Sequence, residues 1–352
     1  MTRLRVDLAR PGDDAALRHL LATNPMEGSI ELAFLREPNY FLASSVQAPF
    51  HQVVVARDGD AIVGAGLRGI RTAYVNGVTR EIGYLGDLRL AEAYRGGTLV
   101  ARGYRFLRDL HADGRAKLYL TVIAGENERA LRTIAAGRAG LPSYRPLGRI
   151  FSPAVRMKPV AAPRAIEVRR AEDVDRDELE ACLARNLRRK QFAPVLSGMP
   201  VPPPAQDGKA LTFYAALRNG RVAGALAAWD QSSFKQTQVV RYHGVIRLLR
   251  PLLRYPRAGE RLRFFYVAFI AIDDDDRDLF AALLSRVVND RRGDGYHYFV
   301  AGLHERDPLL PLLRALPSTP FWARAFAVHF EDGAEEFEKL DGRVPYVELA
   351  IL

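Results

Sequence analysis

The chain of 352 residues is longer than a single hydrophobic core usually supports, so two domains are expected. Its 48% hydrophobic and 26% charged residues are typical of a globular protein, and no apolar run approaches the roughly 20 residues that cross a bilayer. The single cysteine, Cys182, excludes internal disulfides and cysteine-cluster metal sites. Together with a polar N-terminus unlike a signal peptide, these features favour a cytoplasmic protein.

The net charge of +10 is unevenly distributed. Residues 1–160 hold 23 Lys and Arg against 15 Asp and Glu, whereas the remainder holds 28 against 26. A positive first half is expected to attract a polyanionic ligand. Nucleic acid is the competing explanation, but no long basic tract or aromatic-rich basic stripe accompanies the charge.

The sequence repeats its plan once. Residues 4–22 predict a strand, a Pro-Gly-Asp turn and a helix, and residues 166–184 follow the same order. A hairpin is predicted next in each copy, around Asp58-Gly59 and around Asn219-Gly220, because the central positions of a type I′ turn need positive φ. The match continues through a helix, an Asp-Gly pair and a strand in both copies.

A Pro-rich segment, Pro159–Pro163, is the natural linker between the copies. The repeat therefore predicts domains over 1–158 and 164–352. The second copy is longer, and its insertion is assigned to the basic and apolar segment Gly244–Arg261. Because Pro251 interrupts this segment, we expect a helix or loop that covers its own domain rather than a membrane-surface helix.

The segment Tyr84–Leu107 has a pattern that suits phosphate binding. Tyr84–Leu90 alternates apolar and polar residues and predicts a strand, Ala91–Gly97 predicts a turn, and a helix opens at Thr98. Free N–H groups and the positive end of the helix dipole would then point at one position. Gly96 and Gly97 allow close approach of an anion and Arg95 adds charge, although a plain strand–helix turn has the same pattern.

The order of elements, together with LRLAEAYRGGTLVARGYRFL and the ENERA segment 126–130, resembles the GNAT superfamily of acyl-CoA N-acyltransferases. The resemblance covers residues 1–157 and, more weakly, 164–352. It implies an α/β protein of two tandem GNAT-like domains, each with a mixed central sheet flanked by helices. It also implies acetyl-CoA as co-substrate, with its pyrophosphate held by backbone N–H groups of the turn. The cofactor contacts that the resemblance implies are Leu88, Leu90, Arg95, Gly96, Gly97, Thr98, Leu99, Val100 and Asn127.

Four positions depart from the family pattern or have a second explanation. Thr98 and Val100 stand where the family motif has small residues, and only the Thr hydroxyl can replace a lost contact by donating to phosphate. Asn127 matches the family residue beside the pantetheine arm, but it is equally suited to cap a helix. Ile134 occupies the position at which the family often has a Tyr that protonates the leaving thiolate.

Catalysis of amine attack on a thioester requires a deprotonated amine, support for the oxyanion and a proton for the thiolate. Asp87, at the end of the predicted strand, is a candidate base or water-ordering group, and a structural carboxylate is an equal alternative. Glu126 is a second carboxylate candidate. Tyr144 is a candidate replacement for the missing acid.

In the second copy, the position of the glycine turn is taken by four carboxylates, Asp273–Asp276. Like charges repel, so this copy is not expected to bind the pyrophosphate of CoA. The acidic run is assigned to helix capping in preference to a cation or amine site. No metal site is expected, because the His residues lack partners at ligand spacing.

These features predict an acetyl-CoA-dependent N-acetyltransferase that acts on an amine of a small molecule or a protein. The first domain would hold the cofactor, and the second would shape the acceptor site or the assembly. The alternatives are a non-catalytic acyl-CoA sensor and a transferase that uses aminoacyl-tRNA. A membrane partner is not expected and nucleic acid is disfavoured, while a homodimer stays open.

Overall fold

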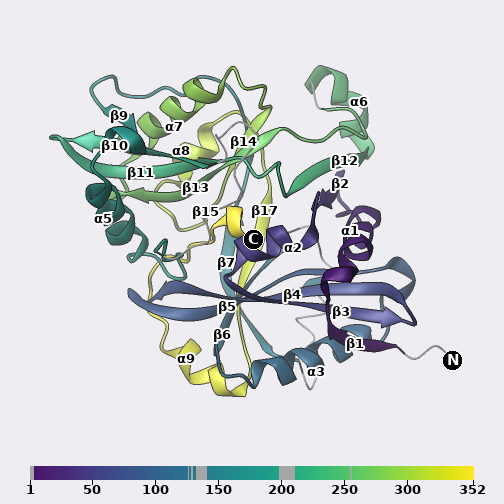
Figure 1. The fold of residues 1–352 in the computed structure, drawn as a ribbon. Coiled ribbons are helices and arrows are strands. Elements are labelled where there is room, and N and C mark those ends of the chain that lie inside the picture. The colour runs from purple at the N-terminus through teal and green to yellow at the C-terminus, as the bar shows by residue number, and fades with distance from the viewer. Residues whose placement is uncertain (1–3, 126, 128–129, 132–140, 198–210, 254–255) are drawn as a thin grey trace.

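The computed structural model describes residues 4–125, 127, 130–131, 141–197, 211–253 and 256–352. Two large mixed sheets, one above the other in Figure 1, carry helices on their faces, and a two-stranded ribbon lies between them. The predicted α/β class with two sheet-and-helix units is therefore confirmed.

The first half of the chain supplies most of the lower sheet in Figure 1. Its strands and helices are β1 (Arg5–Leu8), α1 (Asp14–Thr23), β2 (Ile30–Leu35), α2 (Tyr40–Gln47), β3 (Phe50–Asp58), β4 (Ala61–Val75), β5 (Val78–Leu90), α3 (Leu99–His111), β6 (Leu118–Ala124), β7 (Ser143–Phe151) and β8 (Ala154–Arg156). The strand predicted over 84–90 is the last part of β5, and the helix predicted to open at Thr98 is α3.

The second half supplies most of the upper sheet. Its strands and helices are β9 (Glu167–Arg170), α5 (Arg176–Leu187), β10 (Leu211–Arg218), β11 (Arg221–Trp229), β12 (Gln236–Tyr242), α6 (Gly244–Leu253), β13 (Phe264–Ile272), α7 (Arg277–Arg291), β14 (Tyr298–Ala301), β15 (Leu303–His304), α8 (Leu310–Ala315), β16 (Ser318–Thr319), β17 (Trp322–His329) and α9 (Ala334–Glu338). Each of α3 and α7 connects two parallel strands, as a crossover helix must.

The two halves exchange strands. In the lower sheet the order is β1-β3-β4-β5-β6-β17-β7-β15, so β17 lies between β6 and β7 and is antiparallel to both. In the upper sheet the order is β16-β8-β14-β13-β11-β10-β9, so β8 of the first half pairs with β14 and β16 of the second. Each sheet therefore contains strands from both sides of the linker that the sequence places between residues 158 and 164.

Equivalent pairs of residues reveal the internal repeat in three dimensions. Gly64 of β4 pairs with Leu90 of β5, and Gly224 of β11 pairs with Ile272 of β13 in the same manner. Three residues before each strand end the backbone has positive φ, at Asp87 (55°) and at Phe269 (54°). The register of the neighbouring strand shifts at the same level in both sheets, so each sheet contains an equivalent β-bulge.

The two predicted hairpins are present, and one differs in its turn. Asn219 and Gly220 both have positive φ between β10 and β11, as the type I′ prediction requires. Between β3 and β4, Asp58 still pairs with Ala61, so the turn residues are Gly59 and Asp60. Gly59 alone has positive φ there, which is the requirement of a turn with glycine at its first central position.

The upper sheet is covered by a helix on each face. Residues of α5, including the fully buried Cys182, pack with Ala225 and Ala227 of β11. Residues of α7 pack with Leu226 and Ala228, which point to the opposite face because successive strand side chains alternate. The free cysteine is thus core filling, and burial raises the pKa of its thiol to about 11.

The insertion of the second half forms the strand β12 and the helix α6. β12 pairs with β2 of the first half, and α6 stands away from the two large sheets (Figure 1). Val245 and Leu248 are 67% and 79% exposed, so this end of α6 does not cover its own domain as expected from the sequence. No helix in the described part of the chain is long and apolar enough to cross a membrane.

Candidate functional site

The parallel strands β5 and β6 separate toward their carboxyl ends. Their register pairs are Gly83 with Tyr119 and Tyr84 with Leu120, at the amino end of β6. Beyond this point β6 continues to pair with β17, while β5 follows β4. The Thr121 hydroxyl donates to the carbonyl of Leu85 at 2.7 Å and links the strands where they part. We call the opening between Leu85–Leu90 and Thr121–Ala124 the first-half splay.

The bulge of β5 faces this splay. Ala65 pairs with Arg89 and Leu67 pairs with Gly86, which leaves Asp87 and Leu88 outside the register with β4. Their main-chain groups are therefore directed away from the regular ladder, at the position where β6 has diverged. The side chain of Leu88 is 52% exposed beside them. The backbone around Leu88 is accordingly available to a ligand lying in the splay.

The turn that follows β5 opens the helix α3. Gly96 has φ of 89°, a conformation that glycine adopts without strain. A Cβ on Gly97 would meet nothing closer than the Tyr94 carbonyl at 4.0 Å, so the turn is open there. Thr98 is the N-cap residue, and its side chain makes no capping hydrogen bond. The first turn of α3 thus keeps N–H groups that no side chain of the cap has taken.

Leu99 and Val100, the next two positions after Thr98, are less exposed than the turn. The side chain of Leu99 is 4% exposed and packs with Ala56 and Val63. It therefore holds α3 to the sheet, and only its main chain is open to a ligand. Val100 is half-buried one position further along α3.

The side chain of Arg95 lies against the end of α1. Its Nη1 is 3.0 Å from Glu27 Oε1, its Nη2 donates to Asn24 Oδ1 at 3.2 Å, and its Nε donates to the Leu90 carbonyl at 3.2 Å. These contacts tie the glycine turn to the neighbouring loop. Arg95 therefore stabilises the turn, and its charge is paired with that of Glu27.

Asp87 forms a buried ion pair. Arg36 Nη2 lies 2.5 Å from its Oδ2, and the guanidinium of Arg36 also donates to Ser44 and Gln47. Burial opposes ionisation of Asp87, but the charges of Arg36, Arg89 and Lys235 outweigh it and lower the pKa of the carboxyl. A carboxylate with a lowered pKa is a weak proton acceptor, so Asp87 is better suited to order polar groups than to remove a proton.

Further charged residues, which sequence reasoning missed, meet beside Asp87. Arg71 of β4 and Arg36 both influence the buried hydroxyl of Tyr84, as do Asp87 and Arg89. Lys235, from the loop between β11 and β12, reaches the same place from the second half. The sequence held one signal for this group, which is the charged Arg71 in the otherwise largely apolar strand segment IRTAYV. No sequence signal indicates that Lys235 joins the group, because its position depends on packing between the two halves.

The remaining predicted residues lie apart from this group or outside the described structure. Glu126 and Ile134 are outside the described residues. The side chain of Asn127 is exposed, and its Oδ1 accepts from the main-chain N–H of Ala130 at 3.0 Å, which is a helix cap. The role of Asn127 beside a pantetheine arm stays a prediction.

Tyr144 lies at the far end of the sheet. It is in β7, where it pairs with Val328 of β17, so two strands separate it from β5. Its hydroxyl is hydrogen-bonded to that of Tyr104, and its ring packs edge-on against Phe326. Burial raises the pKa of Tyr144 well above its usual value. The structure does not bring Tyr144 together with Asp87.

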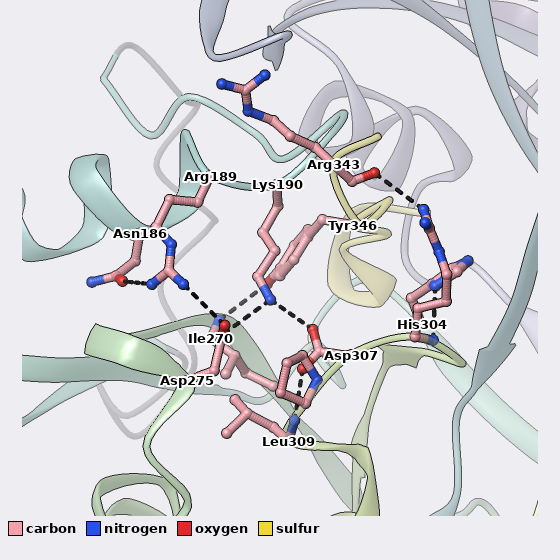
Figure 2. Close-up of polar contacts among 12 residues, drawn as sticks. Asn186, Arg189, Lys190, Ile270, Asp275, His304, Asp307, Leu309, Arg343 and Tyr346 are labelled. Atoms are coloured by element: carbon pink, nitrogen blue, oxygen red, sulfur yellow. Dashed lines mark hydrogen bonds and ion pairs between the residues drawn. The ribbon is translucent and has the colours of Figure 1, made fainter. Parts of the chain in front are cut away.

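The equivalent position in the second half is closed by an ion network (Figure 2). Lys190 Nζ lies 3.1 Å from Asp275 Oδ1 and 3.0 Å from Asp307 Oδ2, between the ends of β13 and β14. The Tyr346 ring lies alongside, with its hydroxyl accepting from the Ile270 N–H. The cavity left among these residues is about 10 Å³, which is room for one water molecule.

The acidic run Asp273–Asp276 has structural partners. Asp273 pairs with Arg185 at 2.6 Å, and Asp276 pairs with Arg218. Asp276 also accepts from the N–H groups of Asp278 and Leu279 and so caps α7. Within the described ranges, no three His, Cys, Asp or Glu residues are placed to hold a metal ion. Capping and ion pairing therefore account for the run.

Comparison with known proteins bears on the fold. No protein-family model and no curated protein matches the sequence. Among solved structures, the chain is similar to Saccharomyces cerevisiae N-myristoyltransferase with bound myristoyl-CoA, with a TM-score of 0.64 and 10% identity over 99% of this chain and 86% of that one. It is also similar to a GCN5-related N-acetyltransferase from Anabaena variabilis, with a TM-score of 0.54 and 10% identity over 92% and 72% of the two chains. A third similar structure is a fungal GCN5-related glucosamine N-acetyltransferase region, with a TM-score of 0.59 and 14% identity over 93% of this chain and 38% of that one.

These similarities define the class of fold. The chain has the fold of the acyl-CoA N-acyltransferases of the GNAT superfamily, in a tandem form that matches N-myristoyltransferase over nearly its whole length. The resemblance that the sequence indicated is thereby confirmed for the fold.

Proposed function

We propose that the protein is an acyl-CoA-dependent N-acyltransferase that uses acetyl-CoA and acylates an amine. The observation that carries the proposal is the first-half splay, with the open Gly96-Gly97 turn and the uncapped start of α3 at its end. Similar folds in solved structures include one with bound myristoyl-CoA and several N-acetyltransferases, which supports this class of co-substrate.

The chain offers a distinct feature for each part of the cofactor. The pyrophosphate is assigned to the N–H groups of Gly96–Thr98 and the first turn of α3, where the helix dipole favours negative charge. The thioester carbonyl is assigned to the main chain at the bulge near Leu88 and Leu90. Asn127, three residues beyond the end of β6, is assigned to the pantetheine arm by the family resemblance alone.

In the reaction, the amine nitrogen forms a bond to the thioester carbon and the carbon–sulfur bond breaks. One proton leaves the amine, and the thiolate gains one to leave as CoA. Asp87, fixed by Arg36, would orient the ammonium group or an ordered water at the bulge. The second half would hold the acceptor, because Lys235 joins the charged group beside Asp87.

The proposal is tested by calorimetry and by thiol release on the full chain. We expect acetyl-CoA to bind with a dissociation constant in the micromolar range, on the order of 10 μM. Acetyl-, propionyl- and longer acyl-CoAs, offered with a panel of amines, should then release CoA with at least one acceptor. Absence of binding by every acyl-CoA would overturn the proposal, and binding without turnover would favour the sensor alternative.

A further inference from the structure

The helix α6 presents apolar side chains that nothing in the described part of the chain covers. Val245 and Leu248 are 67% and 79% exposed, which makes them the two most exposed large apolar side chains among the described residues. They are three positions apart and so lie on one side of a helix that stands away from both large sheets (Figure 1). Single exposed apolar residues need no explanation, but a pair on one side of a protruding helix indicates a contact surface.

The proline in α6 does not disturb this pair. The backbone is helical from Gly244 to Leu253, and Pro251 removes only the N–H that would donate to the carbonyl of residue 247. Val245 and Leu248 both precede Pro251 and belong to the regular first turns of the helix. The interruption that argued from the sequence against a surface helix therefore lies beyond the exposed residues.

Two exposed arginines lie beside the pair and share one hollow. Arg241 stands near the end of β12 and Arg247 is in α6, and neither forms an ion pair with a described residue. Glu31, which pairs with Arg241 across the strands, has its carboxylate 3.2 Å from His243 Nε2 instead. The hollow has a volume of about 550 Å³ and is lined by Arg241, Tyr242, His243, Gly244, Arg247 and Ala258.

The chain returns from α6 along the edge of β12 and brings further positive charge. The Gly259 N–H donates to the carbonyl of Val239 at 2.7 Å and fixes this return beside the strand. Arg257 and Arg261 are exposed on it, and Glu260 accepts from the main-chain N–H of Arg257 at 2.7 Å. We call residues 241–248 and 256–261 the α6 tip. It holds four arginines and one carboxylate.

We propose that the α6 tip docks on an anionic phospholipid surface. Val245 and Leu248 would enter the boundary between headgroups and acyl chains, and Arg241 and Arg247 would contact lipid phosphates at the hollow between them. Two apolar side chains alone bind a bilayer weakly, and so does a small basic cluster, but the two contributions act together on one anionic membrane. The proposal stands apart from the acyl transfer proposed above and does not depend on it.

The size of the apolar surface favours a membrane over a protein partner. A stable protein interface buries about 800 Å² on each partner and takes about 20–30 residues from each side. The exposed large apolar side chains that the structure describes at the tip are only Val245 and Leu248. A lipid surface needs no matching shape, so a small apolar pair surrounded by arginines suits it.

Sedimentation of the full chain with lipid vesicles tests the proposal. The vesicles would be phosphatidylcholine alone and phosphatidylcholine with an equal part of phosphatidylglycerol. We expect about 10-fold or more tighter binding to the vesicles that contain phosphatidylglycerol, and a loss of this preference at high salt. Equal binding to the two kinds of vesicle, or binding to neither, would overturn the proposal.

Paired variants separate the apolar and the basic contributions. V245S/L248S and R241Q/R247Q should each weaken binding to the anionic vesicles by about 10-fold or more. Their controls are V78S, at an apolar residue of β5 that is 56% exposed, and R176Q, at an arginine of α5 whose side chain is 87% exposed. All four replaced surfaces are exposed, so the melting temperature should stay unchanged. Undiminished binding by both double variants would overturn the proposal.

A fluorescent reporter shows which side of the molecule meets the bilayer. L248W should shift its emission to shorter wavelength when anionic vesicles are added, because the indole leaves water. V78W is the matched control and should not shift, and the wild type supplies the background of Trp229 and Trp322. A shift in V78W but not in L248W would place the contact elsewhere and overturn the proposal.

A second copy of the chain is the other candidate occupant of the tip. Light scattering of the free protein would detect a dimer. A dimer that V245S/L248S abolishes, together with no binding to vesicles, would show that the tip joins two chains and would overturn the membrane proposal. A monomer that binds anionic vesicles through the tip would support it.

Discussion

The two halves of the molecule use one arrangement of strands and helices for different purposes. In the first half, β5 and β6 pair only at Gly83–Tyr119 and Tyr84–Leu120, and β5 then forms its bulge at Asp87 and Leu88. In the second half, the corresponding strands β13 and β14 part around Lys190, which is held by Asp275 and Asp307. The second half thus fills its opening with side chains of the chain itself, whereas we propose that acyl-CoA fills the opening of the first half.

The helices that follow these strands show the same contrast. Thr98 stands at the N-cap of α3 without a side-chain capping bond, whereas Asp276 occupies the first N–H groups of α7. In the second half a carboxylate of the chain itself therefore takes the position of an anion. Removing or adding charge at the starts of α3 and α7, or at Lys190, should therefore change cofactor affinity or stability differently in the two halves.

The largest effect is expected from K190M. It leaves Asp307, whose side chain is 5% exposed, without its cation and should lower the free energy of unfolding by about 3 kcal/mol. Urea denaturation would measure the loss, with R176M as a control. The affinity for acetyl-CoA should stay unchanged, and a large drop in that affinity would contradict the division of roles between the halves.

The next effect concerns the glycine turn. G97E places a carboxylate where the pyrophosphate is expected and should weaken acetyl-CoA binding roughly 100-fold through charge repulsion. G97Q has the same size without the charge, and the space around Gly97 is open, so it should weaken binding only a few-fold. Calorimetry on G97E and G97Q separates the effect of the charge on acetyl-CoA affinity from the effect of side-chain size. Equal losses in both variants would show that shape, and not an anion, governs the turn.

A smaller effect is expected at the cap of α7. D276A removes the two capping hydrogen bonds and the pair with Arg218, at a cost of about 1 kcal/mol in the free energy of unfolding. D276N retains the capping oxygen and should recover about half of the loss. Thermal or urea unfolding would measure both. If D276A bound a second equivalent of acetyl-CoA, the capping carboxylate and not Lys190 would be what excludes the cofactor.

The smallest effect is expected from Y144F. The variant loses the hydrogen bond to Tyr104 and should cost about 0.5 kcal/mol of stability. The rate of CoA release should change less than about two-fold, because Tyr144 lies two strands from β5. A drop of about 100-fold or more in that rate at normal stability would restore Tyr144 as a proton donor.

Local patterns predicted the elements that depend on local interactions. The strand ending at Leu90, the turn with Gly96 and the helix α3 follow from alternation, glycine and helix periodicity within one short segment. The expectation that the second copy does not bind acyl-CoA likewise rests on a local pattern, since the four adjacent carboxylates Asp273–Asp276 would repel a phosphate. These inferences needed no knowledge of which strands pair.

Contacts between distant segments were beyond the reach of the sequence. Lys190 lies after α5, and nothing in its neighbours indicates that it enters the splay of the second half. The group around Arg71 and Lys235 joins residues more than 150 positions apart. Such contacts depend on the packing of the two halves, for which one sequence carries no periodic signal.

The exchange of β17 and β8 between the two sheets also affects the order in which the chain can fold during its synthesis. Until residues 322–329 have been synthesised, β6 and β7 each present an unpaired edge, and such edges readily join other chains. The first half therefore cannot finish folding as an independent unit during translation, although its own strands appear early. Each half therefore depends on the other for a complete sheet, and β6, which bounds the first-half splay, gains its second neighbour only when β17 pairs with it.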